Sequence, residues 1–392
     1  MTPEAVPPAA PPTPPTDSRI PPAQHSRLPE LVLAGAHRYQ LVRAWPRGTG
    51  HALLELAAED GTTVAGQWFA DPAALDSAAA TTPAPARVAG DVLLQPGGAD
   101  ARLRALPEVL AEDGARLVAH RPGRRAVVRL GAQDGSAREF AKVVRGSRAA
   151  GLARRGSLVA ELVGDVVPVP RLLDTADVGR GILRWSVVPG RTFHDLGADE
   201  WAPEKARRAW EAAGRAVRHL HEAPRDRVTA RHGATEELGA AADWLRPAVA
   251  HGLLDPALVT RATAHVTAAL ERVPADPPLG VLHRDLHDKQ LLLDDAGTVG
   301  MIDVDTLAVG ERALDVANLL VHLELRQAQG LLTPGVAAAA RAGFLAGVGE
   351  VPGDRVDAYA LATRLRLAGV YAFRPPWRKV AAALLRRVAD RP

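Results

Sequence analysis

The chain has 392 residues, more than one ordinary hydrophobic core holds, and its apolar content of 47% is that of a globular protein. The formal net charge is only +3, so the composition gives no reason to expect a nucleic-acid partner. The chain contains no cysteine, which excludes disulfides, thiolate metal ligands and cysteine nucleophiles.

The N-terminal residues 1–28 are rich in proline and poor in large apolar side chains, which predicts a disordered tail with polyproline character. Such a tail either binds a partner module or is simply solvated, and the second interpretation is favoured. The tail lacks the basic and apolar segments of a secretion signal, and no apolar run reaches the roughly 18 residues of a membrane span. We therefore expect a cytoplasmic protein with no membrane partner.

Residues 29–100 are expected to form a small accessory β-rich element. Strand-like runs at 51–56 and 62–69 flank Asp60-Gly61, a turn signal, and predict a hairpin. The stretch 78–85 is rich in Ala, Thr and Pro, and we expect a loop there. No catalytic constellation is visible in this element.

The next part, residues 101–190, begins with three strand-like runs separated by turn residues, which predict an antiparallel meander. A helix and a further strand are expected before Pro189-Gly190. The three strands are predicted at 116–120, 126–130 and 139–144, the helix at 147–163 and the later strand at 182–188.

Residues 191–392 are expected to be mainly helical, so that a β-rich half precedes an α-rich half in an α+β fold. Proline and an acid at the start of the first helix are typical of a helix N-terminus. The helices are predicted at 203–222, 234–251, 255–272, 311–329, 335–348 and 353–370.

One short region of this second half concentrates acidic and amide side chains. Asp285 and Gln290 lie five positions apart, and Asp303 follows eighteen positions after Asp285. The runs 291–293 and 299–302 predict a hairpin that returns Asp303 toward Gln290. Phosphoryl transfer from ATP needs such a set, because one carboxylate must orient the attacking hydroxyl while other oxygens hold Mg²⁺.

This region resembles the aminoglycoside phosphotransferase and choline kinase family, over roughly residues 115–345. The catalytic loop of that family reads H-x-D-x-x-x-x-N, and His283, Asp285 and Gln290 occupy these places. An Ile-Asp pair follows in the family, matched by Ile302 and Asp303. The resemblance implies a bilobal protein-kinase-like fold that uses ATP and Mg²⁺ to phosphorylate a hydroxyl of a small molecule.

The resemblance also implies roles for individual residues. Asp285 corresponds to the catalytic base and Asp303 to the Mg²⁺ ligand. Gln290 stands where the family usually has Asn, so its amide oxygen lies one methylene further out; maltose kinases of the same broad fold are similar in having Gln here. Asp305 is either a second metal ligand or a hydrogen-bonding partner of the loop, and Asp315 is expected to fix local structure.

Lys142 lies between apolar residues in the middle of a predicted strand, where a lysine is costly unless it is paired or functional. It corresponds to the family lysine that contacts the ATP phosphates. Glu161, on the next helix, is expected to be its ion-pair partner, with Glu139 as the weaker candidate. The alternative is an edge strand on which Lys142 is merely solvated.

Two further segments are candidates for nucleotide contacts. The turn that contains Gly123 and Arg124 has a single glycine, and it either covers the ATP phosphates or is an ordinary charged turn. The segment with Val187 and Val188 resembles the hinge whose backbone bonds the adenine edge.

The identity of the acceptor is open between a sugar, an aminoglycoside and an amino alcohol, with a sugar or metabolite favoured because of the N-terminal element. An aminoglycoside is a polycation and needs an acidic pocket, whereas a sugar needs mixed polar groups and aromatic side chains. Candidate acids are Asp195, Asp199, Glu200, Glu236, Glu237, Asp243 and Glu324; candidate aromatic residues are Trp201, Trp210, Trp244, Tyr371 and Trp377.

Two other functions compete with the kinase. Gln290 and the sparse glycine turn are compatible with a nucleotide-binding regulator that has lost catalysis. His283, Asp285 and His287 could instead build a metal-dependent hydrolase, although no second histidine pair with ligand spacing accompanies them. The sequence gives no oligomeric state.

Overall fold

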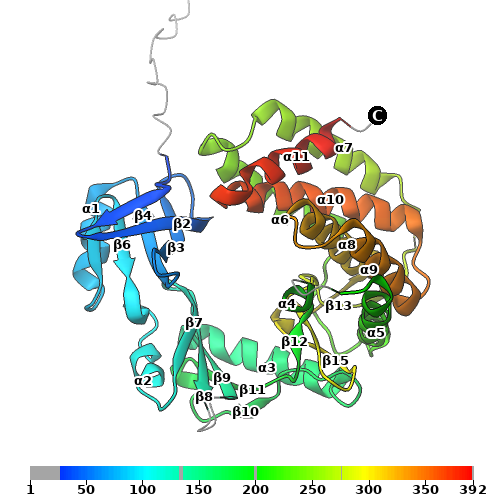
Figure 1. The fold of residues 1–392 in the computed structure, drawn as a ribbon, viewed down its shortest axis with the longest axis horizontal. Helices are drawn as coiled ribbons and strands as arrows, with labels where there is room; N and C mark the ends of the chain where they lie inside the picture. The colour runs from blue at the N-terminus through cyan, green and yellow to red at the C-terminus, as the bar shows by residue number, and fades with distance from the viewer. Residues whose placement is uncertain (1–26, 132–135, 198–200, 275, 391–392) are drawn as a thin grey trace, which may run out of the picture.

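The computed structural model describes residues 27–131, 136–197, 201–274 and 276–390. An N-terminal sheet, a second sheet and a helical part follow one another around a ring, and the N-terminal sheet comes back against the last helices (Figure 1). Of the expected tail, only Arg27 and Leu28 lie within the described residues, and Leu28 is buried. No helix in the described part of the chain is long and apolar enough to cross a bilayer.

The accessory element is a six-stranded sheet with the strand order β1-β2-β3-β4-β6-β5. The predicted hairpin is confirmed, because β3 and β4 pair antiparallel around Asp60-Gly61. The expected loop at 78–85 is partly wrong: α1 extends to Thr81, because Asp71 caps its N-terminus and alanines favour helix. The elements are β1 (Leu31–Ala34), β2 (His37–Pro46), β3 (His51–Ala58), β4 (Thr63–Phe69), α1 (Pro72–Thr81), β5 (Arg87–Ala89) and β6 (Val92–Gln95).

The second sheet has five strands in the order β10-β11-β9-β8-β7. The predicted meander is confirmed as β7, β8 and β9, and the predicted helix as α3, which covers this sheet (Figure 1). The elements of this part are α2 (Leu106–Leu110), β7 (Arg116–Arg121), β8 (Arg125–Gly131), β9 (Ala137–Val144), α3 (Gly146–Val163), β10 (Leu172–Asp174) and β11 (Ile182–Ser186).

The rest of the chain is mainly helical, as predicted, with short strands that carry the acidic region. All six predicted helices are present within two residues of their expected ends, and α4 and α11 are additional helices. The helices are α4 (Phe193–Gly197), α5 (Pro203–Glu222), α6 (Ala234–Ala250), α7 (Pro256–Glu271), α8 (Arg312–Ala328), α9 (Pro334–Val348), α10 (Gly353–Ala372) and α11 (Arg378–Ala389); the strands are β12 (Arg191–Thr192), β13 (Leu279–Leu282), β14 (Leu291–Leu293), β15 (Val299–Met301) and β16 (Ala308–Glu311).

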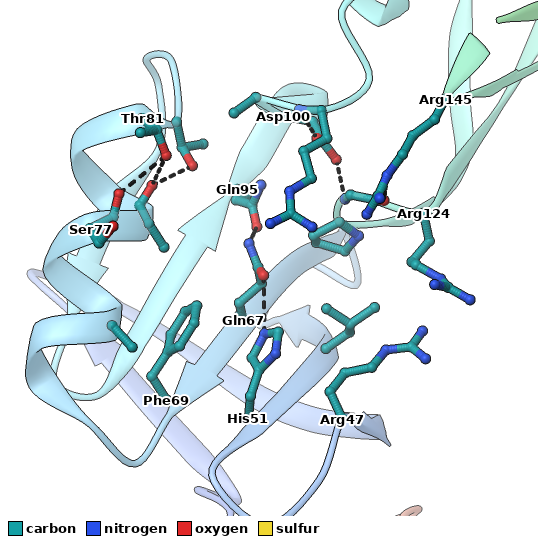
Figure 2. A pocket seen from close by; sticks show the side chains of 18 residues that line it. Arg47, His51, Gln67, Phe69, Ser77, Thr81, Gln95, Asp100, Arg124 and Arg145 are labelled. Carbon is teal, nitrogen blue, oxygen red and sulfur yellow. Dashed lines mark hydrogen bonds between the residues drawn. The ribbon is translucent and has the colours of Figure 1, made fainter. Parts of the chain in front are cut away.

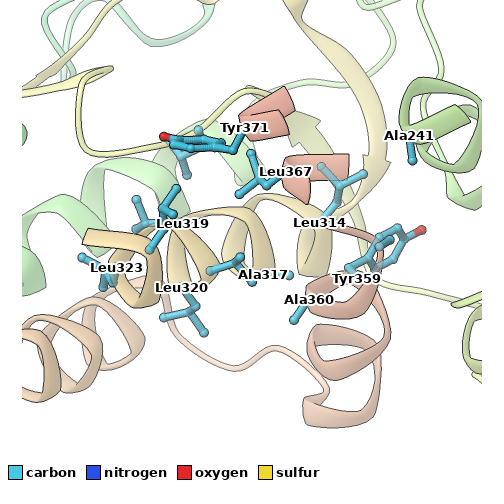
Figure 3. Close-up of a cluster of buried hydrophobic side chains, with 14 of the residues drawn as sticks. Ala241, Leu314, Ala317, Leu319, Leu320, Leu323, Tyr359, Ala360, Leu367 and Tyr371 are labelled. Atoms are coloured by element: carbon cyan, nitrogen blue, oxygen red, sulfur yellow. The ribbon is translucent and has the colours of Figure 1, made fainter. Parts of the chain in front are cut away.

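Helices α8 and α10 form the centre of the helical part (Figure 3). Leu314, Leu320 and Leu323 of α8 are at most 3% exposed and face buried residues of α10 such as Tyr359 and Leu367. Because α8 is buried nearly all round, it provides a rigid support for the loop that precedes β14.

The accessory sheet precedes the second sheet in the chain, and it also packs against the helical part. The amide of Ala44 donates a hydrogen bond to the carbonyl of Phe373 at 2.9 Å, and Glu30 forms an ion pair with Arg378. Trp68 is 1% exposed and packs edge-on against His251, with ring centroids 5.8 Å apart. The N-terminal element is therefore joined to both other parts, which closes the ring.

One glycine of α3 permits a close approach between this helix and the second sheet. A Cβ atom on Gly156 would lie 2.2 Å from the ring of Trp185, a buried residue of β11. We expect Gly156→Ala to lower the free energy of unfolding by about 1–3 kcal/mol, because overpacking outweighs the better helix propensity of alanine. Urea denaturation measures this change.

Gly239→Ala in α6 is the matched control, since nothing lies within 4 Å of the added atom. This variant is expected to be neutral or more stable by up to about 1 kcal/mol. Equal stability of the two variants would contradict the packing described for Trp185.

Candidate active site

The loop 283–290 is held in place by one buried carboxylate beneath it. Asp315, in the first turn of α8, is fully buried and accepts the backbone amides of His283 at 2.8 Å and Arg284 at 2.7 Å. The ring of His221 lies 3.2 Å from the same carboxylate. Arg284 has a φ of 72°, a left-handed conformation that costs energy in a non-glycine residue. Asp315 thus stabilises the strained backbone directly before Asp285, as expected from the sequence.

A hairpin brings the second acidic residue to this loop. β14 and β15 pair antiparallel, and the amide of Ile302 donates to the carbonyl of Gln290 at 2.9 Å. The Nε2 atom of His283 donates to the carbonyl of Ile302 at 3.0 Å. These bonds fix the backbone directly before Asp303, which is itself in a left-handed conformation with φ of 57°. The predicted hairpin is confirmed, and it places Gln290 and Asp303 together.

Asp285, Gln290 and Asp303 line one cleft of about 500 Å³. The cleft is bounded by the accessory sheet, by the β7–β8 turn and by the helices α8 and α10. Within the described parts of the chain, the carboxylate of Asp285 accepts no hydrogen bond, so it is available to an incoming hydroxyl. Other lining residues include Arg43, Trp45, Arg121, Arg125, Trp244, His287, Lys289, Asp305, His322, Arg326, Arg366, Tyr371 and Arg374.

Lys142 points from β9 toward this cleft. Its ammonium group forms an ion pair with Asp305 and lies 3.5 Å from Asp303. Burial opposes ionisation of Asp303, but Lys142 and Arg125 hold the pKa of its carboxyl below its usual value. The lysine is 12% exposed in its side chain, so the solvated alternative is wrong.

The expected ion pair between Lys142 and Glu161 is wrong in this structure. Glu161 pairs instead with Arg227 at 2.5 Å, and Glu139 accepts from Arg184. The reason is position along α3: Arg155 reaches the carbonyl of Asp305, and Glu161 lies six residues, or about 9 Å, further along the axis. The ion-pair partner of Lys142 is therefore Asp305.

The β7–β8 turn faces the cleft with different residues from those expected. Arg121 and Arg125 are paired across the two strands and both line the cleft, whereas Gly123 and Arg124 line a second cavity on the opposite side. Residues opposite each other in a hairpin share one face, and the tip between them turns away. Gly123 and Arg124 therefore lie away from the cleft, and the residues of this turn that line it are Arg121 and Arg125.

A model of the phosphotransferase enzyme family, APH, matches residues 115–355, more than half of the chain. The chain belongs to this family. A streptomycin 3''-kinase of Streptomyces griseus is 32% identical over 199 residues, which are 47% of this chain and 70% of that protein. The chain is thus a phosphotransferase of small molecules, and the predicted membership is confirmed.

Solved structures of phosphotransferases show the same fold. An amicoumacin kinase in complex with AMP-PNP, Ca²⁺ and Ami has a TM-score of 0.53 at 13% identity, covering 73% of this chain and 92% of that one. The GDP and kanamycin complex of APH(2")-IIia has a TM-score of 0.52 at 16% identity, covering 74% and 96%. The expected bilobal, protein-kinase-like α+β fold is confirmed.

The segment expected to act as the hinge of this phosphotransferase follows a strand. β11 ends at Ser186, so Val187 and Val188 lie just beyond it. Val188 is buried against Gly300 of the β14–β15 hairpin. The structure thereby connects the second sheet to the acidic hairpin at this point, and the adenine contact remains a prediction.

The cleft contains residues that the sequence alone did not single out. Arg43 and Trp45 come from β2 of the accessory sheet, and the guanidinium groups of Arg43 and Arg121 lie 4.5 Å and 4.4 Å from the centre of the Trp45 ring. Arg326 of α8 forms two hydrogen bonds with Asp288, at 2.7 and 2.9 Å. The sequence signal that could have indicated a role for β2 in the cleft is Trp45 in a strand-like run. Nothing in the sequence indicates that this strand reaches the distant loop 283–290.

The acids considered for an aminoglycoside that lie within the described residues do not line the cleft. Within the described residues they have other partners: Asp195 with Thr192, Glu236 with the amide of Gly233, Glu237 with His232 and Arg366, Asp243 with Arg246, and Glu324 with Arg364. Asp199 and Glu200 lie outside the described residues. Of the candidate aromatic residues, Trp244 and Tyr371 do line the cleft.

The hydrolase alternative does not fit the geometry. The Nε2 atom of His283 is committed to the carbonyl of Ile302, and His283 is fully buried. Burial lowers the pKa of His287 to about 4, and its ring packs against His322 at 4.8 Å. In the described part of the chain no three His, Asp, Glu or Cys side chains are arranged to hold a metal ion.

Mg²⁺ makes a smaller demand on the protein, because it keeps several waters and binds through one or two protein oxygens together with the substrate phosphates. The carboxylate of Asp303 and the amide oxygen of Gln290, held beside each other by the hairpin, fit this requirement. Both are oxygen donors, and Lys142 keeps Asp303 ionised.

Proposed function

We propose that the chain transfers the γ-phosphoryl group of ATP, with Mg²⁺, to a hydroxyl of a neutral or anionic small molecule. The observation that carries this proposal is the convergence of Asp285, Gln290 and Asp303 on one cleft, with Lys142 against Asp303. Family membership supports transfer to a small molecule, and the donor nucleotide and the acceptor class are inferred from the cleft.

In this proposal Asp285 accepts the proton of the acceptor hydroxyl as its oxygen attacks the γ-phosphorus. The bond to the β–γ bridging oxygen breaks, and ADP leaves. Asp303 and Gln290 would hold Mg²⁺, which neutralises phosphate charge. Lys142, Arg121 and Arg125 supply positive charge on the opposite wall, where it stabilises the transferring group.

The charges around the cleft support the acceptor class. Seven cationic side chains line it, Arg43, Arg121, Arg125, Lys289, Arg326, Arg366 and Arg374, against the three carboxylates Asp285, Asp303 and Asp305. Arg43, Arg326 and Arg366 have carboxylate partners in Glu55, Asp288 and Glu237. Within the described residues, Lys289 and Arg374 have no carboxylate within ion-pair distance and are not assigned to the phosphates of ATP, so a polycation would meet uncompensated like charge.

Aromatic side chains make the acceptor side suitable for a sugar-like molecule. Trp45, Trp244 and Tyr371 line the cleft, and Arg374 stacks on Tyr371 at 4.1 Å. Flat apolar faces beside hydrogen-bonding cations are typical of pockets that bind polyhydroxylated ligands. This arrangement favours a sugar or sugar acid over an aminoglycoside.

The test is phosphoryl transfer from labelled ATP to a mixture of sugars and sugar acids. We expect a phosphorylated product that requires Mg²⁺, that is lost with a chelator and that returns when Mg²⁺ is added in excess. Binding of Mg-ATP by calorimetry, without transfer to any acceptor of the mixture or to water, would instead support the inactive regulator. Transfer that is indifferent to the chelator would contradict the roles of Asp303 and Gln290.

A further inference from the structure

A second cavity, of about 480 Å³, lies between the accessory sheet and the β7–β8 turn (Figure 2). Its walls come from β3, β4 and α1 on one side and from residues 122–124 and Arg145 on the other. Arg47, Arg124 and Arg145 lie on one side of it, opposite Ser77 and Thr81 of α1 (Figure 2). The catalytic cleft lies on the other face of the same turn, where Arg121 and Arg125 are found.

The cavity carries an excess of positive charge. Arg47, Arg102, Arg124 and Arg145 line it, and within the described residues none of them has a carboxylate within ion-pair distance. Burial, and then the nearby charges of Arg148 and Arg145, lower the pKa of Arg124 from its ordinary value. Arg47, Arg102 and Arg124 are exposed, so a dissolved anion has access to them.

Among the described residues one carboxylate, that of Asp100, lines this cavity, and it does not neutralise that charge. Asp100 is buried and accepts the amides of Arg102 at 2.7 Å, Leu103 at 3.1 Å and Gly123 at 2.6 Å, and the ring of His120 lies 2.9 Å away. Its oxygens are therefore used to hold the turn in place. A ligand at the cavity would meet guanidinium groups without competition from this acid.

The floor of the cavity suits the body of an organic ligand. Gln95 donates to the carbonyl of Ala99, so its amide oxygen accepts from Gln67, and the oxygen of Gln67 accepts from Nε2 of His51 (Figure 2). Within the described residues this chain of bonds leaves Nδ1 of His51 as a hydrogen-bond acceptor without a partner. The His51 ring also stacks on Phe69, with centroids 4.6 Å apart and planes 12° apart, which gives a flat surface.

We propose that this cavity binds a small phosphate ester, with the phosphate among Arg47, Arg102 and Arg124 and the organic group over His51 and Phe69. Guanidinium forks match the oxygens of a phosphate, and an ester of charge near −2 compensates the cluster better than a carboxylate does. The occupant joins the accessory sheet to the β7–β8 turn and so orders the turn whose other face lines the catalytic cleft. The cavity is an effector site, separate from the catalytic cleft.

Isothermal titration with phenyl phosphate tests the site, since this probe has no alcohol that could be phosphorylated. The titration is done on the full chain with Mg-AMP-PNP in excess, to keep the probe from the catalytic cleft, and repeated without nucleotide. We expect one molecule bound, with affinity about tenfold or more weaker in Arg47→Ala and in Arg102→Ala. Arg38→Ala, an exposed arginine of the same sheet outside the cavity, is expected to bind as wild type does.

Benzoate and inorganic phosphate are the comparison ligands, and hydrogen exchange of residues 119–126 is the second readout. Bound phenyl phosphate is expected to slow exchange in the turn of wild type and not of an Arg47→Ala/Arg102→Ala double variant. Absence of binding, equal binding of benzoate, or binding unchanged in both arginine variants would overturn the proposal. Because no readout requires turnover, these results are independent of whether the proposed transfer reaction is found.

Discussion

Asp285→Asn is expected to lower kcat by about 10²–10⁴-fold while leaving the affinity for Mg-ATP within a few fold. The side chain keeps its shape but loses the group that accepts the hydroxyl proton. In the structure this carboxylate lines the cleft and accepts no hydrogen bond within the described residues, so its replacement disturbs little else. The measurement is steady-state kinetics at saturating ATP, paired with calorimetric titration of the nucleotide.

Asp295→Asn provides the control for this variant, because it makes the same chemical change at an exposed position of the β14–β15 hairpin turn. Its kcat is expected to match that of wild type. If Asp285→Asn retained kcat within about threefold, the assignment of this residue as the base would be wrong.

Asp315→Ala is expected to have the largest effect on stability. Its fully buried carboxylate holds the amides of His283 and Arg284 and lies against His221, so truncation leaves these groups without an acceptor. Removing one partner of a buried charged network costs about 3–5 kcal/mol of unfolding free energy. We expect a loss of this size in urea denaturation.

The same variant tests how the loop is positioned. Without Asp315, the amides of His283 and Arg284 lose their acceptor, so the left-handed backbone of Arg284 is less well held and Asp285 shifts with it. Where the variant is still folded, kcat is expected to fall roughly a hundredfold, as a displacement of about 1 Å does. Asp357→Ala, an exposed acid of α10, is the control and should change neither quantity. Wild-type kcat in a destabilised Asp315→Ala protein would show that the loop holds itself in place.

Local patterns allowed most of the secondary structure to be predicted. The β14–β15 hairpin and its turn are set by residues within a few positions of each other, so the sequence sufficed to bring Asp303 back to Gln290. The helices α5 to α10 were likewise visible from apolar spacing and from N-terminal signals. Helix α1 was not predicted, because the Ala-, Thr- and Pro-rich composition of residues 78–85 is typical of a loop.

Contacts between distant parts of the chain could not be predicted in this way. Which acid pairs with Lys142 depends on which residues of α3 lie beside the segment that follows the β14–β15 hairpin. The spacing of residues along the sequence does not reveal this. Gly123 and Arg124 were assigned to the wrong face because a turn tip has no alternation to follow. The contribution of Arg43 and Trp45 to the cleft requires the accessory sheet to dock on α10, through Ala44 and Phe373.

The closed ring gives the accessory sheet two distinct relations to the catalytic cleft. On one side β2 supplies Arg43 and Trp45 to its wall. On the other side β3, β4 and α1 border the arginine-rich cavity behind the β7–β8 turn. The same added sheet therefore borders both the cleft and the second cavity.

The central claim is that this cleft phosphorylates a neutral or anionic hydroxyl compound in preference to a polycation. Its most direct test compares kcat/KM at saturating Mg-ATP for sugars, sugar acids, amino alcohols and aminoglycosides, with Asp285→Asn as the blank. We predict the highest value for a sugar or sugar acid, at least about a hundredfold above any aminoglycoside, since like charge in the acceptor site costs several kcal/mol. A higher kcat/KM for an aminoglycoside such as streptomycin than for every neutral or anionic acceptor would contradict the account.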